Sequence, residues 1–275
     1  SMMPRRNCRR RQGQVVPDRQ CRRGEAADRI CCQKGRRQYR ATRARYTHQV
    51  IDHAQLLRPL VKASFEIECE SAGPTVSRAL ALALTHPMGP VHLDLSPAVA
   101  AMIDAHPKVL GPTTLLAPAI GAADPAILTL AQHLSKVDRP LILAGFEAAR
   151  ADAGPHVLRL AEAVGAPVLT TYKGKGLIPE THPLSLGGAG LSPLADTIML
   201  DLIRRADLIL MIGYDPIEMR LGWLDPVADP DRIIEITTAA PDHAMHHAAI
   251  RLVADTADAT AALAAAAGVM IRSGP

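Results

Sequence analysis

From residue 124 onward, short apolar runs alternate with longer amphipathic segments. The apolar runs predict five strands, at 140–144, 167–171, 207–212, 232–237 and 250–253. The helical period predicts helices around them, at about 124–136, 154–164, 194–205 and 255–268. Strands that are apolar on both faces and alternate with helices are typical of a parallel sheet covered on both sides. We therefore predict an α/β central domain over residues 124–268, with a doubly wound, Rossmann-like parallel sheet, and a tail at 269–275.

A smaller pattern lies upstream, in residues 47–98. It predicts a helix near residue 52, an alternating strand at 63–67, an amphipathic helix at 74–84 and a short buried strand at 90–95. One such unit is too small to bury its own faces, so we interpret it as a partial α/β unit. The stretch 97–123 holds four prolines and no sustained period, and we assign residues 99–123 to a linker.

The net charge of +4 conceals a sharp division. Residues 1–45 contain 15 Lys and Arg against 3 acids, whereas the remaining 230 residues have a balance of −8. Four of the five cysteines also lie in the basic stretch, and no apolar period is visible there. Such a segment cannot bury enough apolar area to offset its ordering entropy, so we expect residues 1–46 to have low order. An arm that binds nucleic acid is the weaker interpretation, and translation out of frame before residue 46 is a further hypothesis.

The apolar runs also bear on location. None approaches the roughly 18 residues needed to span a bilayer, and no apolar signal core follows the basic start of the chain. We therefore expect a soluble, cytoplasmic protein that has no membrane partner.

Three blocks of sequence resemble one enzyme family. Residues 165–190, with the sequence GAPVLTTYKGKGLIPETHPLSLGGAG, look like the middle domain of the acetolactate synthase, benzoylformate decarboxylase and pyruvate oxidase group of thiamine-diphosphate enzymes. GPVHLDLSP at 89–97 resembles the strand that closes the pyrimidine-binding domain of these enzymes. RADLILMIGYD at 205–215 resembles their next strand-and-glycine unit. The resemblance spans about 47–268 and implies that residues 47–98 are the C-terminal remnant of a pyrimidine-binding domain.

The catalytic residues of that family are not found. Its first domain supplies a Glu to N1′ of the cofactor, and its third binds Mg²⁺ and diphosphate through Gly-Asp-Gly…Asn. Glu25 is the only Glu before Glu66, but it lies too close to Pro90 and in an Arg-rich context, and no Gly-Asp-Gly occurs. We expect no catalytic or metal-binding residue here. The chain is then a structural fragment of a 2-oxo-acid decarboxylase or carboligase, whose parent, a lyase or transferase, uses thiamine diphosphate and magnesium.

Two kinds of partner follow from this interpretation. The first is the pair of missing pyrimidine- and diphosphate-binding domains of the parent enzyme. The second is a weak homodimer, because linker surface that normally packs against neighbours would leave apolar patches exposed.

A nucleotide site on the central domain is the alternative function. Glycines at strand ends let backbone N–H groups approach a phosphate. By position, six residues would face such a ligand: Gly145, Thr171, Gly188, Gly190, Gly213 and Asp215. The chain would then be a stand-alone module for FAD or an adenine nucleotide such as ADP. The other interpretation, that these glycines make tight turns, is favoured because GFEAARAD lacks the glycine run of FAD-binding members and GGAGLSP replaces Gly-Met-His-Gly. We expect no nucleotide in this chain.

One histidine cluster, PDHAMHHAA, could suggest a metal site. His243 and His247 are four residues apart, with His246 between them, but no carboxylate-rich partner is near. We expect these histidines in a surface helix or loop.

Overall fold

The computed structural model describes residue 45 and residues 51–104, 118–241 and 244–272. Nearly all of the basic segment 1–46, including Glu25, and much of the linker 99–123 lie outside the described residues, so what we expect of them stays a prediction. The chain divides between Leu115 and Leu116 into two compact units.

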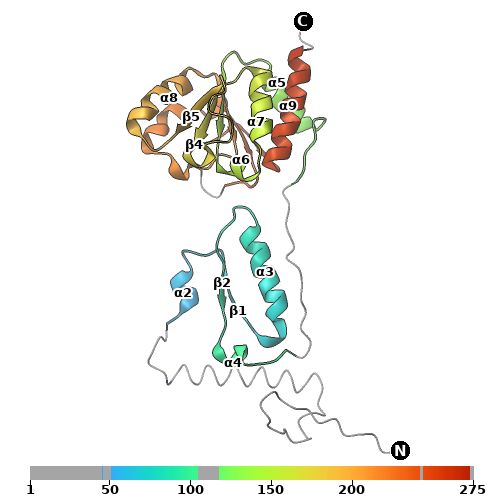
Figure 1. Ribbon diagram of the computed structural model, residues 1–275, viewed down its shortest axis with the longest axis vertical. Coiled ribbons are helices and arrows are strands. Elements are labelled where there is room, and N and C mark those ends of the chain that lie inside the picture. Colours follow the sequence, from blue (N-terminus) through green and yellow to red (C-terminus); the bar gives the residue numbers. More distant parts are fainter. Residues whose placement is uncertain (1–44, 46–50, 105–117, 242–243, 273–275) are drawn as a thin grey trace, which may run out of the picture. The chain divides into compact units, whose positions relative to one another are not determined.

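The N-terminal unit has a two-stranded parallel sheet (Figure 1). Its elements are α2 (His53–Leu57), β1 (Ser64–Glu66), α3 (Ala72–Leu84), β2 (His92–Asp94) and α4 (Pro97–Ala100), with a 3-10 turn at Cys69–Ser71. The prediction of a buried strand at 90–95 is wrong, since Leu93 is 36% exposed and Leu95 48%. Strand β2 packs mainly against β1, α2 and α3.

Lys62 caps the end of α3 in this unit. Its Nζ donates to the carbonyl oxygens of Leu82, Thr85 and Pro87 at 2.7, 2.7 and 2.9 Å. The last carbonyls of a helix have no donor within the helix. The ammonium group supplies those donors and also lies at the negative end of the helix dipole.

The central domain is built on a six-stranded, all-parallel sheet of order β5-β4-β3-β6-β7-β8. The strands are β3 (Pro140–Ala144), β4 (Val168–Thr171), β5 (Ser185–Ala189), β6 (Leu208–Ile212), β7 (Ile233–Thr237) and β8 (Ile250–Val253). The chain starts in the middle at β3, proceeds outward to β5, and then returns to β6 on the other side of β3. The predicted doubly wound, Rossmann-like fold is confirmed, with its switch point between β3 and β6.

Helices cover both faces of this sheet (Figure 1). One face carries α5 (Pro125–Leu134), α6 (Phe146–Arg150), α7 (Gly154–Val164) and α9 (Thr256–Arg272). The other carries α8 (Pro193–Arg205) and the 3-10 turns η3 (Pro216–Glu218), η4 (Leu221–Trp223), η5 (Asp225–Val227) and η6 (Pro230–Arg232). Helix α5 begins close to the predicted position, with Asp124 as its N-cap and Pro125 in its first turn. None of the helices in these ranges is both long enough and apolar enough to cross a membrane.

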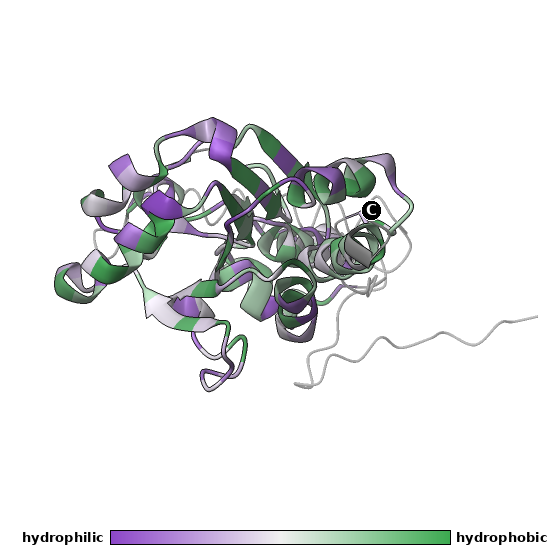
Figure 2. Cartoon of the chain, turned by 90° about the horizontal axis from the view of Figure 1, so that it is seen from above, coloured by the Kyte–Doolittle hydropathy of each residue, from purple (hydrophilic) through white to green (hydrophobic). Residues whose placement is uncertain are grey.

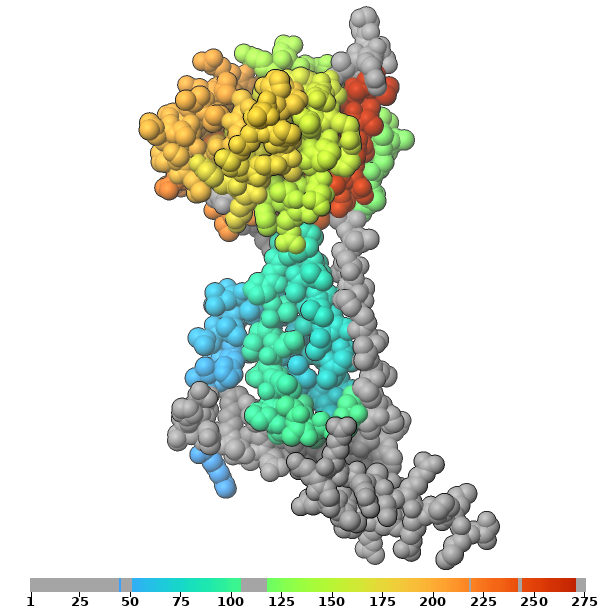
Figure 3. Space-filling model, viewed as in Figure 1, coloured from blue at the N-terminus to red at the C-terminus, as the bar shows by residue number. Residues whose placement is uncertain are grey.

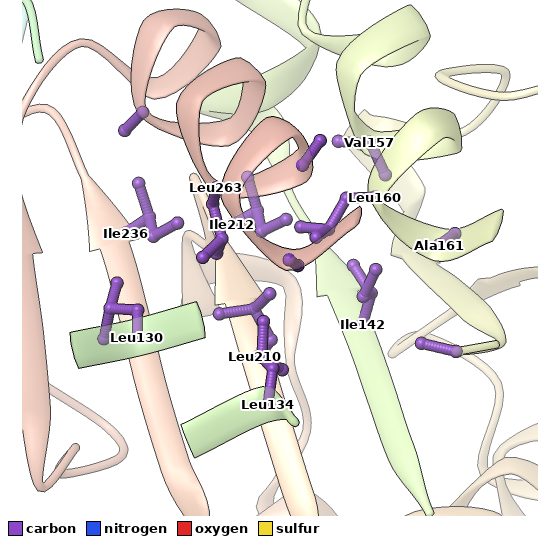
Figure 4. Packing of buried hydrophobic residues seen from close by; sticks show 14 of the residues in the cluster. Leu130, Leu134, Ile142, Val157, Leu160, Ala161, Leu210, Ile212, Ile236 and Leu263 are labelled. Atoms are coloured by element: carbon purple, nitrogen blue, oxygen red, sulfur yellow. The ribbon is translucent and has the colours of Figure 1, made fainter. Parts of the chain in front are cut away.

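Alternate residues of the strands point to opposite cores. Ile142, Ile212 and Ile236 point toward the helices α5, α7 and α9, where they meet Leu160 and Leu263 (Figure 4). The hydropathy colouring shows the same arrangement, with hydrophobic strands in the middle of the domain (Figure 2). This two-sided burial explains why β3 and β6 are apolar at every position.

The alanines of α9 let it pack closely against α7. In Figure 3 the red surface of α9 lies directly beside the yellow-green surface of α7. The helix continues to Arg272, so the tail predicted at 269–275 begins too early. The reason is that Val, Met, Ile and Arg after Gly268 continue the helix, and no Pro comes before residue 275 to stop it.

Two elements of the central domain were not expected from the pattern. Strand β5 has the sequence SLGGA, whose glycines argue against a strand, and pairing with β4 holds it at the edge of the sheet. Helix α6 has only five residues, which is too short for a helical period to be visible.

Candidate functional site

The six residues predicted to face a nucleotide all lie along the carboxyl edge of the sheet. Gly145 follows β3, Thr171 ends β4, and Gly188 and Gly190 lie at the end of β5. Gly213 and Asp215 follow β6. In a parallel sheet these ends share one edge, and β5, β4, β3 and β6 are neighbours in that order. This edge is also where open α/β sheets bind ligands.

Gly145 and Gly213 pack against each other at the switch point. The Gly145 N–H donates to the carbonyl of Ile212 at 2.9 Å, and the Glu147 N–H donates to that of Gly213 at 3.0 Å. A Cβ on Gly145 would lie 2.5 Å from the carbonyl oxygen of Gly213, and one on Gly213 would lie 2.3 Å from the Ala148 nitrogen. These two glycines therefore bring two backbones into direct contact.

Glu147 is a residue of this edge that sequence reasoning missed. Its Oε2 accepts hydrogen bonds from the Thr237 hydroxyl at 3.0 Å, the Thr238 N–H at 3.0 Å and the Thr238 hydroxyl at 3.2 Å. The Thr238 hydroxyl also lies 3.1 Å from that of Thr256 in the first turn of α9. One carboxylate thus ties α6 to the end of β7 and the start of α9. The available signal was the acid in GFEAARAD, in place of the family's glycines.

Thr171 and Gly188 lie on the β4–β5 side of the edge. Thr171 is fully buried, and among the described residues its hydroxyl has no hydrogen-bond partner. Gly188 has more room than Gly145, since a Cβ there would lie 3.7 Å from Thr170 Oγ1 and 3.8 Å from Lys175 Cδ. Lys175 forms an exposed ion pair with Glu180 at 3.3 Å.

Gly190 is held by a buried acid. Its φ of 122° is in the region that favours glycine, and its N–H donates to Oδ1 of Asp196 at 3.0 Å. The other oxygen, Oδ2, accepts from the Trp223 indole at 3.0 Å. Beside them is an open hollow of about 490 Å³, lined by Pro193, Asp196, Leu200, Met219, Arg220, Leu221, Gly222 and Trp223.

The carboxylate of Asp215 is engaged in a hydrogen bond within its own turn. It caps η3 by accepting a hydrogen bond from the Ile217 N–H at 3.0 Å. Of the six predicted residues, Gly145, Gly190, Gly213 and Asp215 therefore all make contacts within the chain that fix the turns at the edge.

His246 lies in the interior rather than on the surface as expected. It is 7% exposed and its ring lies 5.7 Å from that of Tyr214. Burial lowers the pKa of His246 to about 4. A hydrogen bond with the Val227 backbone acts in the opposite direction, and the nearby His247 lowers the pKa further. Burial, Asp215 and Glu235 raise the pKa of the Tyr214 hydroxyl. His246 is buried because its neighbours Met245 and Ala248 pack against the core on this face of the sheet. His247 is exposed as expected, and His243 is outside the described residues.

Comparison with known proteins identifies this fold. Residues 127–263 match the family described as "Thiamine pyrophosphate enzyme, central domain". The chain belongs to the thiamine pyrophosphate enzymes. The predicted family and the central-domain assignment are thereby confirmed.

Several thiamine pyrophosphate enzymes are similar to most of this chain. The probable acetolactate synthase large subunit of Methanococcus aeolicus is 37% identical over 199 residues, which are 68% of this chain and 32% of the relative. The oxalyl-CoA decarboxylase of Escherichia coli K12 is 27% identical over 183 residues, 64% of this chain and 30% of the relative. The chain therefore spans about a third of these relatives. The alternative of a stand-alone nucleotide-binding module gains no support from them.

A solved structure has the same fold. It is a candidate thiamin diphosphate-dependent enzyme from Mycobacterium smegmatis, with a TM-score of 0.63 and 23% identity, covering 78% of this chain and 41% of that one. At this identity the likeness supports the fold alone.

The residues that the structure describes do not fit a thiamine diphosphate or magnesium site. In the described ranges, no three His, Cys, Asp or Glu side chains are grouped so that they could hold a metal ion. The whole sequence contains no Gly-Asp-Gly. No catalytic step can therefore be assigned to the side chains described here.

Proposed function

We propose that this chain is the structural central domain of a thiamine-diphosphate-dependent 2-oxo-acid decarboxylase or carboligase similar to acetolactate synthase. The observation that carries the proposal is the family match over residues 127–263. The carboxyl edge supports it, because Gly145, Gly190 and Gly213 and the acids Glu147, Asp196 and Asp215 there are engaged in contacts within the chain. In this role the domain supplies a rigid platform, and the chemistry belongs to other parts of the parent.

The partners in this proposal are a pyrimidine-binding and a diphosphate-binding domain of the parent, which together hold thiamine diphosphate and Mg²⁺. We propose that the central domain binds neither FAD nor ADP. Should a nucleotide bind, the residues nearest to it would be Gly145, Thr171, Gly188, Gly190, Gly213 and Asp215. The parent would work in the cytoplasm, which fractionation of its native cells would test.

We also propose weak self-association of this chain. Leu194 and Ile198 are 85% and 67% exposed on α8, and they lie one helical turn apart. Sedimentation at rising concentration should reveal a weak dimer that is lost in Leu194→Gln/Ile198→Gln. A strictly monomeric wild type would contradict this part of the proposal.

A domain exchange tests the structural role. Residues 127–263 would replace the matching segment of the full-length Methanococcus aeolicus relative, which is 37% identical. A structural platform should leave pyruvate-dependent acetolactate formation in place, with a changed thermal stability. A chimera that folds and assembles but has lost turnover would contradict a purely structural role.

The isolated chain provides a second test. With thiamine diphosphate, Mg²⁺ and pyruvate, we expect no release of CO₂ and no saturable binding of the cofactor. Turnover that disappears in Glu25→Gln would overturn the proposal, because Glu25 is the only Glu before Glu66.

A further inference from the structure

Three hydrogen-bond donors converge on a single oxygen at the end of β7. The Thr237 hydroxyl, the Thr238 N–H and the Thr238 hydroxyl lie 3.0, 3.0 and 3.2 Å from Oε2 of Glu147. We propose that these donors form an oxyanion-binding site that the chain fills with its own Glu147 carboxylate. We call it the Thr237–Thr238 anion site. The inference deepens the proposed structural role, because it explains why a nucleotide phosphate would be kept off this part of the edge.

The chemistry of the site suits an oxyanion. The Thr238 N–H and the two hydroxyls can all donate to the carboxylate oxygen, although the Thr237 hydroxyl also lies 3.1 Å from the carbonyl oxygen of Ala239. Hydrogen bonds to an ionised acceptor are stronger than those between neutral groups. The site also lies where phosphates bind in this type of fold, at the carboxyl end of a strand and beside the start of a helix. The N-terminus of α9 is already capped, because Asp255 accepts from the Asp258 N–H at 2.9 Å.

The backbone of Glu147 is fixed beside Gly213, and this keeps its side chain next to the Thr237–Thr238 anion site. Its N–H donates to the carbonyl of Gly213, and a Cβ on Gly213 would lie only 2.8 Å from the Cβ of Glu147. A phosphate could use the Thr238 N–H only after displacing this carboxylate. The two groups are both negatively charged and would repel each other. Glu147 thus both satisfies the donors and excludes phosphate-bearing ligands.

Removing the carboxylate should convert this contact into a binding site for free anions. The test measures the thermal unfolding of the full chain and of Glu147→Ala against acetate, inorganic phosphate and ADP, with NaCl holding the ionic strength constant. Glu162→Ala is the matched control, because Glu162 is 54% exposed and contacts only His182, at 3.4 Å, among the ion pairs described.

We expect Glu147→Ala to melt several degrees below the wild type and to recover saturably with acetate or phosphate, as mass action requires. The wild type and Glu162→Ala should show no saturable shift with either anion. Recovery with phosphate but not with ADP would assign the site to free oxyanions. Recovery with ADP at lower concentration would assign it to the phosphate of a nucleotide, and both outcomes support an anion site.

Two results would overturn the proposal. One is that Glu147→Ala gains no saturable response to any of the three anions, which would make Glu147 an ordinary structural cap. The other is that the wild type responds to them with the same affinity. Where Glu147→Ala is insoluble, expression and purification in acetate or phosphate should recover folded protein, and failure to do so counts against the site. Because no turnover is measured, these outcomes are independent of the domain exchange.

Discussion

The indole N–H of Trp223 donates to the carboxylate of Asp196 across 3.0 Å. Both side chains are buried, and the second oxygen of Asp196 accepts from the Gly190 N–H. A single acid near the start of α8 therefore joins the end of β5 to the 3-10 turns that cover the sheet.

Replacing this acid should destabilise the central domain. Asp196→Ala leaves two buried donors without acceptors, and each such loss costs about 1–3 kcal/mol. Since Trp223 is the only tryptophan, its fluorescence during urea unfolding reports on this contact directly. Asp201→Asn, on the exposed side of α8 with Arg204 as its partner, should change the free energy of unfolding by less than about 0.5 kcal/mol. Equal effects of the two substitutions would contradict the role of Asp196.

The switch point should tolerate no side chain at Gly213. Its φ of 55° disfavours alanine, and the added Cβ would lie 2.3 Å from the Ala148 nitrogen. Gly213→Ala should cost roughly 4 kcal/mol or more, or prevent folding. Gly165 has a φ of 65° but no atom within 4 Å of an added Cβ, so Gly165→Ala should cost only about 1–2 kcal/mol. Denaturant unfolding of both variants separates the close contact from the backbone preference.

His246 should make stability depend on pH. Its pKa falls from 6.5 in the unfolded chain to about 4 in the folded protein, mainly because of burial. Between these values the unfolded chain binds more protons, so this contribution is complete above pH 6.5 and is lost as the pH falls toward 4. At 1.4 kcal/mol per pKa unit, the loss is at most about 3 kcal/mol.

The comparison of variants isolates that contribution. Melting temperatures from pH 4 to 7 should vary less in His246→Phe than in the wild type. His133→Gln, at an exposed position in α5, should leave the wild-type profile unchanged. An unaltered profile in His246→Phe would exclude His246 as the source.

Lys62 should protect the end of α3 from local opening. Lys62→Met keeps the aliphatic stem but removes the ammonium that bonds to three carbonyls. We expect a loss of about 1 kcal/mol of local stability. Hydrogen exchange of peptides covering residues 80–95 should be faster in this variant than in the wild type. Arg58→Met, an exposed change in the same unit, should not accelerate it.

Local pattern was enough for three elements of the central domain. Strand β3, helix α7 and strand β8 have the predicted bounds, 140–144, 154–164 and 250–253. The apolar run of β3 and the helical apolar period of α7 produce this signal without knowledge of any partner. The family resemblance likewise rested on consecutive residues.

Only the tertiary structure decided what occupies the carboxyl edge. Strand β5 exists because its SLGGA sequence pairs with β4, and His246 is buried because distant residues cover it. The carboxylate of Glu147 meets Thr238 from 91 positions away in the sequence. Hydrogen bonds of this kind depend on which strand ends become neighbours. Sequence alone could therefore place the glycines on the edge, but not reveal the hydrogen bonds that Glu147 and Asp196 form there with distant parts of the chain.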